Sequence, residues 1–525
     1  MRPTRLALMV LLASVASASG CSDAEDAPWD GHYTPLEERG DWVDSGPKST
    51  CQVLDSPEVA CGSLASFDLS RCQRRTLSTL ERAGIYRGEL RASFGAGDPA
   101  PRGPVGAGFK LDAQGLPQRV QGMPATDGVW DARTFLVTGQ DASGTFTFVG
   151  CNAVSPRSLT GCYSRCRQGR LVEAGTFRVE RMARFKGEVD ASGGMRLVSE
   201  TYVGLGMPVD VHVVGHHAYV VSQDRQGAPG GLTVFDVSDP AAPVWVAELV
   251  PPGNSDWKGV ASRKNVLYVA SSQRGVVVVD ISEPTAPRVI GHVPEEPTDV
   301  SLVSVAEDRL YALAMAPRSG TLMFDLTTPT APQLLERIAS GSRLSDEPNT
   351  SRGAVSYEGR LYVNHLHDGL QVVDARNATR VQVLGRYTYP YTNSRASAVG
   401  TFAGRVVAFE SSLGVGARVR ALDVTDPARI VKIGEYGLRG AVSPRGMELR
   451  GNRLYMTYHQ EGVRVLDVSN PTHPREVAYF NSFRETDPNR GDSMMEGATG
   501  LQVPGDGHVY VVDTSRGLLV LTEPQ

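Results

Sequence analysis

One phrase recurs six times in the last three-fifths of the chain: an apolar run, an Asp, and a short turn that usually contains proline. Clear copies are GLTVFDVSDPAAP from Gly231, GVVVVDISEPTAP from Gly275 and GVRVLDVSNPTHP from Gly462. The repeated aspartates, 44 to 49 residues apart, are Asp236, Asp280, Asp325, Asp374, Asp423 and Asp467. Units of this period that are rich in β-formers predict four-stranded blades stacked around an axis.

Each unit divides into four short strands. In the second unit we expect strands at 259–262, 266–271, 275–281 and 288–293, which are rich in Val, Leu, Ile and Tyr and bounded by turn residues. The third strand is almost continuously apolar, which is typical of a strand buried on both faces. The repeats therefore predict an all-β fold whose core lies between neighbouring blades.

The last unit is incomplete, because 499–503, 508–513 and 517–522 supply only three strands. The segment 195–204, MRLVSETYVG, is similar to the outer strands of the other units. We expect it to complete the last blade, since closing the ring removes an edge that would invite aggregation. The prediction is a seven-bladed β-propeller over residues 195–525.

The pentads VVVVD at 276–280, LTVFD at 232–236, LQVVD at 370–374 and VRVLD at 463–467 carry a family resemblance. With the turns that follow them, they resemble the bacterial LVIVD-repeat β-propeller proteins over residues 195–525. The pattern differs at 375–380, which lacks both prolines, and at Thr522, which replaces the Asp. The family is defined by its repeats, so the resemblance implies a fold and no particular reaction.

The N-terminus has the features of an export signal. Arg2 and Arg5 precede a short apolar stretch, and Ala18-Ser19-Gly20-Cys21 is similar to a lipoprotein cleavage site. We therefore expect residues 1–20 to be a lipoprotein signal peptide and Cys21 to carry a lipid that anchors the chain in the membrane. Ser22 favours the outer membrane of a bacterial cell envelope. Ala18, where Leu is preferred, leaves ordinary secretory cleavage as an alternative.

The remaining cysteines all precede the repeats. An even number in an exported chain predicts three disulfides, with fifteen possible pairings. Zinc binding is the alternative, because two of them are four residues apart, but a second close pair is missing. The six are Cys51, Cys61, Cys72, Cys151, Cys162 and Cys166.

These features divide the chain before the propeller. Residues 21–50 are acidic and aperiodic, which predicts a solvated tether. Residues 51–190 are expected to form a small disulfide-bearing β-rich module, with strands near 84–94, 134–138, 145–149 and 175–185 and a short helix near 74–82. The net charge of −5 provides no basic footprint for nucleic acid.

The repeated aspartates suggest either a metal-lined ring or a turn motif. Each ends an apolar strand, usually just before a Ser/Thr-x-Pro turn, where a carboxylate can accept hydrogen bonds from turn amides. We therefore interpret them as structural.

Binding is expected on the loops at one end of the propeller, where blade-specific segments meet. The predicted face for a protein or glycan ligand comprises Trp257, Lys258, Arg274, Arg318, Arg395, Arg445 and Arg516. No cofactor is predicted. A metal site is a less favoured hypothesis for the same end, because imidazole and carboxylate suit divalent ions although the spacing matches no metal motif. Its residues would be His365, His367, Asp368, His459 and Glu461.

The sequence thus favours a binding or scaffold module over an enzyme. The alternative is an extracytoplasmic hydrolase or lactonase-like propeller, and a purely structural envelope component is a third hypothesis. The Gly-x-Ser-x-Gly motif of many hydrolases is missing from the sequence. His212 is interpreted as a residue that lines the axis rather than as a general base.

Overall fold

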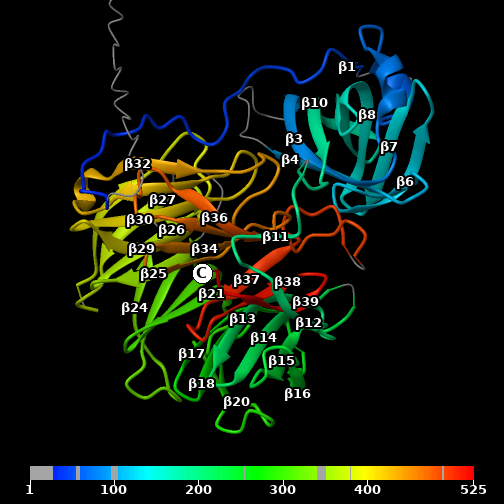
Figure 1. The fold of residues 1–525 in the computed structure, drawn as a ribbon. Coiled ribbons are helices and arrows are strands. Elements are labelled where there is room, and N and C mark those ends of the chain that lie inside the picture. Colours follow the sequence, from blue (N-terminus) through cyan, green and yellow to red (C-terminus); the bar gives the residue numbers. More distant parts are fainter. Residues whose placement is uncertain are drawn as a thin grey trace, which may run out of the picture.

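A computed structural model describes residues 28–54, 60–95, 105–185, 187–225, 227–253, 255–339, 351–378, 380–487 and 490–524. The predicted signal peptide and Cys21 lie outside these residues. The described chain forms a closed eight-stranded barrel followed by a seven-bladed propeller (Figure 1). The prediction of an all-β chain, with a disulfide-bearing β-rich module before a propeller, is confirmed.

Blades 1 to 5 are four-stranded antiparallel sheets whose strands follow chain order from the axis outward. Blade 1 contains β13 (Met207–Val214), β14 (His217–Gln223), β15 (Gly231–Asp236) and β16 (Val244–Leu249). Blade 2 contains β17 (Trp257–Arg263), β18 (Val266–Ser271), β19 (Gly275–Asp280) and β20 (Arg288–Val293). Blade 3 contains β21 (Asp299–Ala306), β22 (Arg309–Ala316), β23 (Gly320–Asp325) and β24 (Gln333–Ala339).

Blade 4 contains β25 (Ser351–Tyr357), β26 (Arg360–His365), β27 (Gly369–Asp374) and β28 (Gln382–Tyr387). Blade 5 contains β29 (Ser394–Phe402), β30 (Arg405–Ser412), β31 (Val419–Asp423) and β32 (Val431–Tyr436), with the 3₁₀ turn η3 (Pro427–Arg429) before its outer strand. The strands of the second unit match their predicted ranges to within two residues at each end.

Blades 6 and 7 each take a strand from the segment between barrel and propeller. Blade 6 contains β33 (Met447–Arg450), β34 (Arg453–Thr457), β35 (Val463–Asp467) and β36 (Arg475–Phe480), with β11 (Ala191–Ser192) added at its outer edge. Blade 7 contains β37 (Ala498–Gln502), β38 (His508–Asp513) and β39 (Gly517–Thr522), and β12 (Leu197–Thr201) pairs with β39 as its outer strand. The predicted closure by 195–204 is confirmed.

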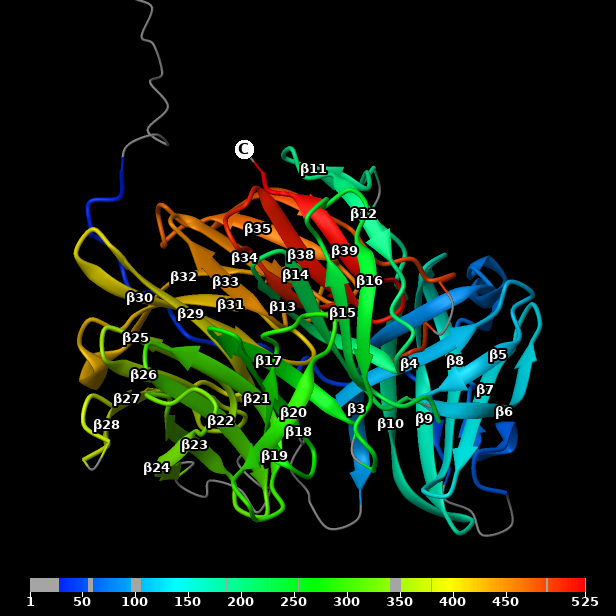
Figure 2. The same cartoon turned by 90° about the horizontal axis from the view of Figure 1, so that it is seen from below.

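The ring is closed at the axis as well. Each inner strand contacts the inner strand of the next blade, and β37 contacts β13. The inner strands gather around the centre of the propeller, with β16, β20 and β24 at its rim (Figure 1; Figure 2 gives a second view).

The third strands explain the continuous apolar pentads. In β19, Val276 and Val278 pack in a cluster shared with blade 3, whereas Val277 and Val279 pack in a cluster shared with blade 1. Successive side chains of a strand point to opposite faces, and both faces of this strand are covered. Every position of the pentad before the Asp is therefore a core position.

The repeated aspartates have the structural role that the sequence predicts. All six accept a hydrogen bond from the backbone N–H two residues later, at 2.6 to 3.1 Å. Hydrogen bonds from Ser282 and Arg376 lower the pKa values of Asp280 and Asp374, respectively, to about 2. These carboxylates hold turns in place, since they satisfy amides that the sheet leaves open.

The predicted β-rich module is a barrel in which each strand pairs with the next and β10 pairs with β3. Its core is aromatic, with Phe109 stacked on Tyr86 and in contact with Phe135 and Phe148. The strands are β3 (Gly84–Gly95), β4 (Val105–Leu111), β5 (Pro117–Val120), β6 (Met123–Trp130), β7 (Phe135–Asp141), β8 (Gly144–Ser155), β9 (Ser158–Arg167) and β10 (Arg170–Arg181).

The three disulfides tie the segment before the barrel to β8 and β9. They join Cys51 to Cys162, Cys61 to Cys166 and Cys72 to Cys151. All six sulfurs are thereby used, so the zinc alternative is not supported. The segment forms β1 (Gln52–Val53), η1 (Leu64–Ser66), β2 (Phe67–Asp68) and the 3₁₀ helix η2 (Arg74–Thr79), where a short helix was expected.

The solvated tether predicted for 21–50 is wrong for residues 28–50, which we call the strap. The strap lies along the propeller and then enters the barrel (Figure 1). Leu36 N donates to the carbonyl oxygen of Lys432 in β32, and the Tyr33 hydroxyl donates to Asp423. At the other end, Trp42 Nε1 donates to Glu89 of the barrel. The strap therefore connects the two folded units by contact with both.

The acids of the strap pair with a buried cation. Arg420, whose side chain is 1% exposed, lies in β31, and its guanidinium is 2.9 Å from Glu38 and 2.6 Å from Asp41. Lys432 lies 3.6 Å from Glu38. A run of acids normally indicates solvation, but here their partner stands 382 residues later in the chain. Local composition cannot reveal a pair so distant in sequence.

Blade 6 repeats this arrangement with the segment that leaves the barrel. Arg464, like Arg420, stands three residues before the repeated Asp of its blade and is almost fully buried. Its guanidinium lies 2.9 Å from Glu188, which follows the last barrel strand. Both connections of the barrel are thus fixed to matching positions of adjacent blades by a buried ion pair.

We predict that Glu38→Gln lowers the free energy of unfolding by about 2 kcal/mol, because it removes a charge-assisted partner of buried Arg420. Burial opposes ionisation, but hydrogen bonding and the charge of Arg420 outweigh it and lower the pKa of Glu38 from 4.5 to about 2. The stabilisation is therefore complete above pH 4.5 and is lost as the pH falls through about 2. Denaturant unfolding at both ends of this range measures it.

Glu37→Gln is the matched control, because it removes the same charge from a side chain that is 70% exposed and pairs only with Arg39 among the described residues. It should change stability little at either pH. Equal losses for the two variants at pH 7 would contradict anchoring of the strap through Glu38.

Candidate functional site

A basic residue occupies the same place in four blades. In blades 2, 4 and 5, Lys258, Arg352 and Arg395 are the residues that a β-bulge inserts near the start of the inner strand. In blade 6, Arg445 matches them, because its N–H donates to the carbonyl oxygen of Thr457 just before β33. A bulge redirects the side chain of its extra residue. We call Lys258, Arg352, Arg395 and Arg445 the axial cluster.

The three arginines of the axial cluster come from consecutive blades and affect one another. Burial, together with the positive charges of Arg445 and Arg352, lowers the pKa of Arg395 to about 9. Burial also lowers the pKa of Arg352 and of Arg445, against the opposing effects of Asp299 and Asp210. The inner ends of blades 4 to 6 therefore concentrate positive charge near the axis.

Carboxylates compensate only part of this charge. Lys258 Nζ lies 2.6 Å from Asp299. Asp210 accepts the N–H of Val260 at 3.0 Å, and burial raises the pKa of Asp210 to about 6. Within the described residues, no carboxylate lies at ion-pair distance from the three arginines of the axial cluster, and Arg352 Nε is buried without a hydrogen-bond partner.

His459 lies beside the axial cluster and has a strained backbone and an incompletely hydrogen-bonded imidazole. Its backbone is left-handed, with φ of 37°, which is strained for a residue other than glycine. Nδ1 lies 2.6 Å from the carbonyl oxygen of Ser443 and must donate to it. Burial lowers the pKa of His459 to about 3, with Arg445, Arg395 and Arg87 contributing. Nε2 is therefore an unprotonated acceptor at neutral pH, and it is buried without a partner among the described residues.

The residues of the metal-site hypothesis do not converge. His365 contacts Ser351 Oγ at 3.3 Å and Gln371 Oε1 at 3.1 Å, within its own blade. Asp368 lies 3.6 Å from Arg386, and His367 is partly exposed beside it. Glu461 is held between Arg439 and Arg464.

Within the described part of the chain, the one set of three possible metal ligands with atoms close together is Cys51, Cys72 and Cys151. These sulfurs are in disulfides. Within the described residues, the five residues that the sequence suggested therefore do not form a metal centre.

The residues of the predicted binding face lie in different environments. Arg318 is exposed and Arg274 partly exposed at the loops. Trp257 is fully buried, with its Nε1 unpaired, and Arg516 is buried in an ion pair with Glu200. The prediction thus combined core residues, loop residues and members of the axial cluster.

Sequence reasoning missed Arg352. The available signal was the match of Ser-Arg-Gly at 351–353 with Ser-Arg-Ala at 394–396 and Pro-Arg-Gly at 444–446. Once the blades are aligned by their repeated Asp, these tripeptides fall at the start of the inner strands.

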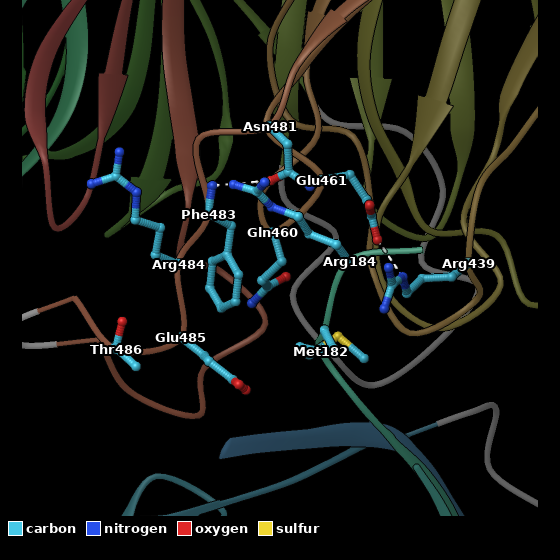
Figure 3. A pocket seen from close by; sticks show the side chains of 11 residues that line it. Met182, Arg184, Arg439, Gln460, Glu461, Asn481, Phe483, Arg484, Glu485 and Thr486 are labelled. Carbon is cyan, nitrogen blue, oxygen red and sulfur yellow. Dashed lines mark hydrogen bonds and ion pairs between the residues drawn. The ribbon is translucent and has the colours of Figure 1, made fainter. Parts of the chain in front are cut away.

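A cavity of about 290 Å³ lies where the barrel meets blades 6 and 7 (Figure 3). The Glu461 carboxylate pairs directly with the Arg439 guanidinium on one side of it, and Glu485 pairs with Arg181 at the end of β10. Its charged walls thus largely pair with each other and belong to the contact between the two units. It is lined by Met182, Ala183, Arg184, Arg439, Gln460, Glu461, Asn481, Phe483, Arg484, Glu485 and Thr486.

A Ser–His contact joins the inner strands of blades 1 and 2. His212 Nε2 lies 2.8 Å from Ser262 Oγ, and burial lowers the pKa of His212 to about 4. The imidazole is therefore neutral at pH 7, as a general base requires. Within the described residues, no carboxylate bonds to its other nitrogen.

Comparison with known proteins bears on the fold. No curated protein sequence matches the chain. Among solved structures, the computationally designed Ika8 protein aligns with 11% identity and a TM-score of 0.40, over 76% of this chain and 96% of that one. The WD40 β-propeller domain of Doa1 aligns with 12% identity and a TM-score of 0.45, over 63% of this chain and 97% of that one. Similarities this weak carry no argument about function.

Within the described residues, no helix has the length and apolar character needed to cross a bilayer. The model of the LVIVD repeat matches residues 205–249, 257–294 and 445–482, which cover blades 1, 2 and 6. Together with the seven closed blades, these matches show that the chain forms a seven-bladed β-propeller that contains LVIVD repeats.

Proposed function

We propose that the chain is an exported binding or scaffold protein of the bacterial cell envelope that holds a protein or glycan ligand at the axial end of its propeller. The observation that carries the proposal is the axial cluster. Its arginines repeat at one structural position and have no partner carboxylate within the described residues, whereas Arg420 and Arg464 are neutralised within the fold. Charged groups with perturbed pKa values and no partner charge are common at functional sites.

Export is supported by the disulfides, which form and persist in oxidising compartments. The N-terminal sequence supports lipid attachment at Cys21 and sorting to the outer membrane. The lipid would keep the protein at the envelope without a spanning helix.

We predict that Cys21→Ala moves the protein from the membrane fraction to the soluble fraction of the envelope, because the lipid is its anchor. Fractionation of cells that express full-length wild type or variant, followed by immunoblotting, measures the change. Thermal unfolding of the variant should match that of wild type. Retention of the variant in membranes after a high-salt wash would contradict lipid anchoring.

We predict that Arg352→Gln with Arg395→Gln abolishes capture of envelope material by the purified mature chain, because both changes remove charge at the axial end. Cross-linking to isolated envelopes, read as the amount of cross-linked partner, tests this. Arg288→Gln with Arg376→Gln is the matched control, since both residues are exposed and pair with repeated aspartates. Equal capture by both double variants would contradict the proposed site.

A hydrolase is the second candidate, favoured by the 2.8 Å contact between His212 and Ser262. A serine nucleophile normally needs its histidine oriented by a third group, which the described residues do not supply. We therefore predict that Ser262→Ala leaves the hydrolysis of an activated ester unchanged. A fall of roughly a hundredfold or more, with an unchanged melting temperature, would favour the hydrolase instead.

A further inference from the structure

The axial cluster has the geometry of a receptor for negative oxygen atoms. Arg352, Arg395 and Arg445 approach from three consecutive blades, each at the start of an inner strand. A guanidinium presents its donors in a planar fork that matches the oxygens of carboxylate, phosphate or sulfate. Arg352 and Arg445 lie close enough to Arg395 to lower its pKa, so the three forks are near enough to one another to share one oxyanion.

The free site contains unmet hydrogen-bonding capacity. Arg352 Nε is a buried donor without an acceptor among the described residues. His459 Nε2 is a buried acceptor without a donor. Within a fold, buried polar groups are normally paired with protein or water, so a group of orphans indicates a place that something polar occupies.

The carboxylates near the axial cluster are engaged by other groups. Asp299 is engaged by Lys258 at 2.6 Å, and Asp210 accepts backbone amides of Val211 and Val260. From the barrel, buried Arg87 adds further positive charge next to His459, and its own carboxylate neighbours are Asp492 and Glu496. These four carboxylates therefore make no ion pair with the three arginines at the inner ends of blades 4 to 6.

We propose that the arginines of the axial cluster bind an oxyanion group of the ligand, with Arg395 at the centre and Arg352 and Arg445 on either side. This inference rests on the proposed binding function and specifies its chemistry. His459 Nε2 accepts a hydrogen bond from a hydroxyl of the same ligand. Acidic saccharides and phosphorylated sugars combine these two kinds of group.

The test uses the full mature chain and four probes: sodium phosphate, sulfate, citrate and glucuronate, each at constant ionic strength against chloride. Ligands that bind the folded state raise the melting temperature, and tighter binding raises it more. We expect at least one oxyanion to raise it more for wild type than for Arg395→Gln, because salts excluded from protein surfaces stabilise both chains alike. The order of the probes distinguishes phosphate, sulfate and carboxylate as the group that is recognised.

Arg395→Gln should weaken binding of that probe by roughly tenfold to a hundredfold, because a charge-assisted hydrogen-bond pair is lost. Arg395→Lys keeps the charge without the fork and should retain part of the affinity. Arg288→Gln, the exposed control, should leave affinity unchanged. Isothermal titration gives these ratios.

Stability without ligand provides a second readout. Because Arg395 lies between two cations, Arg395→Gln should melt at or above the wild-type temperature, whereas Arg420→Gln should melt below it. A lower melting temperature for Arg395→Gln would mean that this residue supports the fold, and would overturn the inference.

The remaining outcomes separate the two proposals. If no probe binds above chloride but envelope capture still depends on Arg352 and Arg395, the oxyanion inference fails and the binding function stands. If capture is also independent of these residues, both fail. Equal weakening by Arg395→Gln and Arg288→Gln would show general charge attraction and would overturn the site.

Discussion

Two buried arginines at matching positions of blades 5 and 6 determine how the parts of this molecule are joined. Arg420 pairs with Glu38 and Asp41 of the strap at closer range than with Glu410 of its own blade, and Arg464 pairs with Glu188 at closer range than with Glu461 and Glu476. Because a buried charge that loses a partner is strongly destabilised, each blade is stabilised by its external segment. The chain before the barrel and the chain after it are held to neighbouring blades for the same electrostatic reason.

The arginines of the axial cluster, in contrast, have no carboxylate at ion-pair distance within the described residues. Arg395 lies between Arg352 and Arg445. Its charge therefore destabilises its neighbours in the free protein, whereas the charge of Arg420 is favourable. Both residues lie in blade 5, Arg395 in the inner strand and Arg420 in the third strand.

The sequence predicted those features that repetition makes visible. The period of the Asp residues located the blades, and the resemblance of 195–204 to outer strands predicted the pairing of β12 with β39. The turn role of the aspartates followed from their place before Ser, Thr and Pro. The contacts of the strap were missed because Glu38 and Arg420 are 382 residues apart. The closed barrel was missed because its sequence contains no repeat from which the number of strands can be counted. Arg352 was missed because only the strand pairing shows that it stands in a bulge at the same position as Arg395.

The bulge explains how four blades present a basic side chain at one position of the inner strand. A bulged residue lies outside the ladder of paired residues, so its side chain is redirected. The corresponding bulges of blades 1, 3 and 7 contain Val209, Ser301 and Thr499, and none is charged. Positive charge is therefore concentrated on consecutive blades 4 to 6, and two of these also anchor the barrel. Because the charge of Arg87 in the barrel acts on His459 together with the charges of Arg445 and Arg395, the two folded units jointly determine the electrostatic environment of the axial cluster.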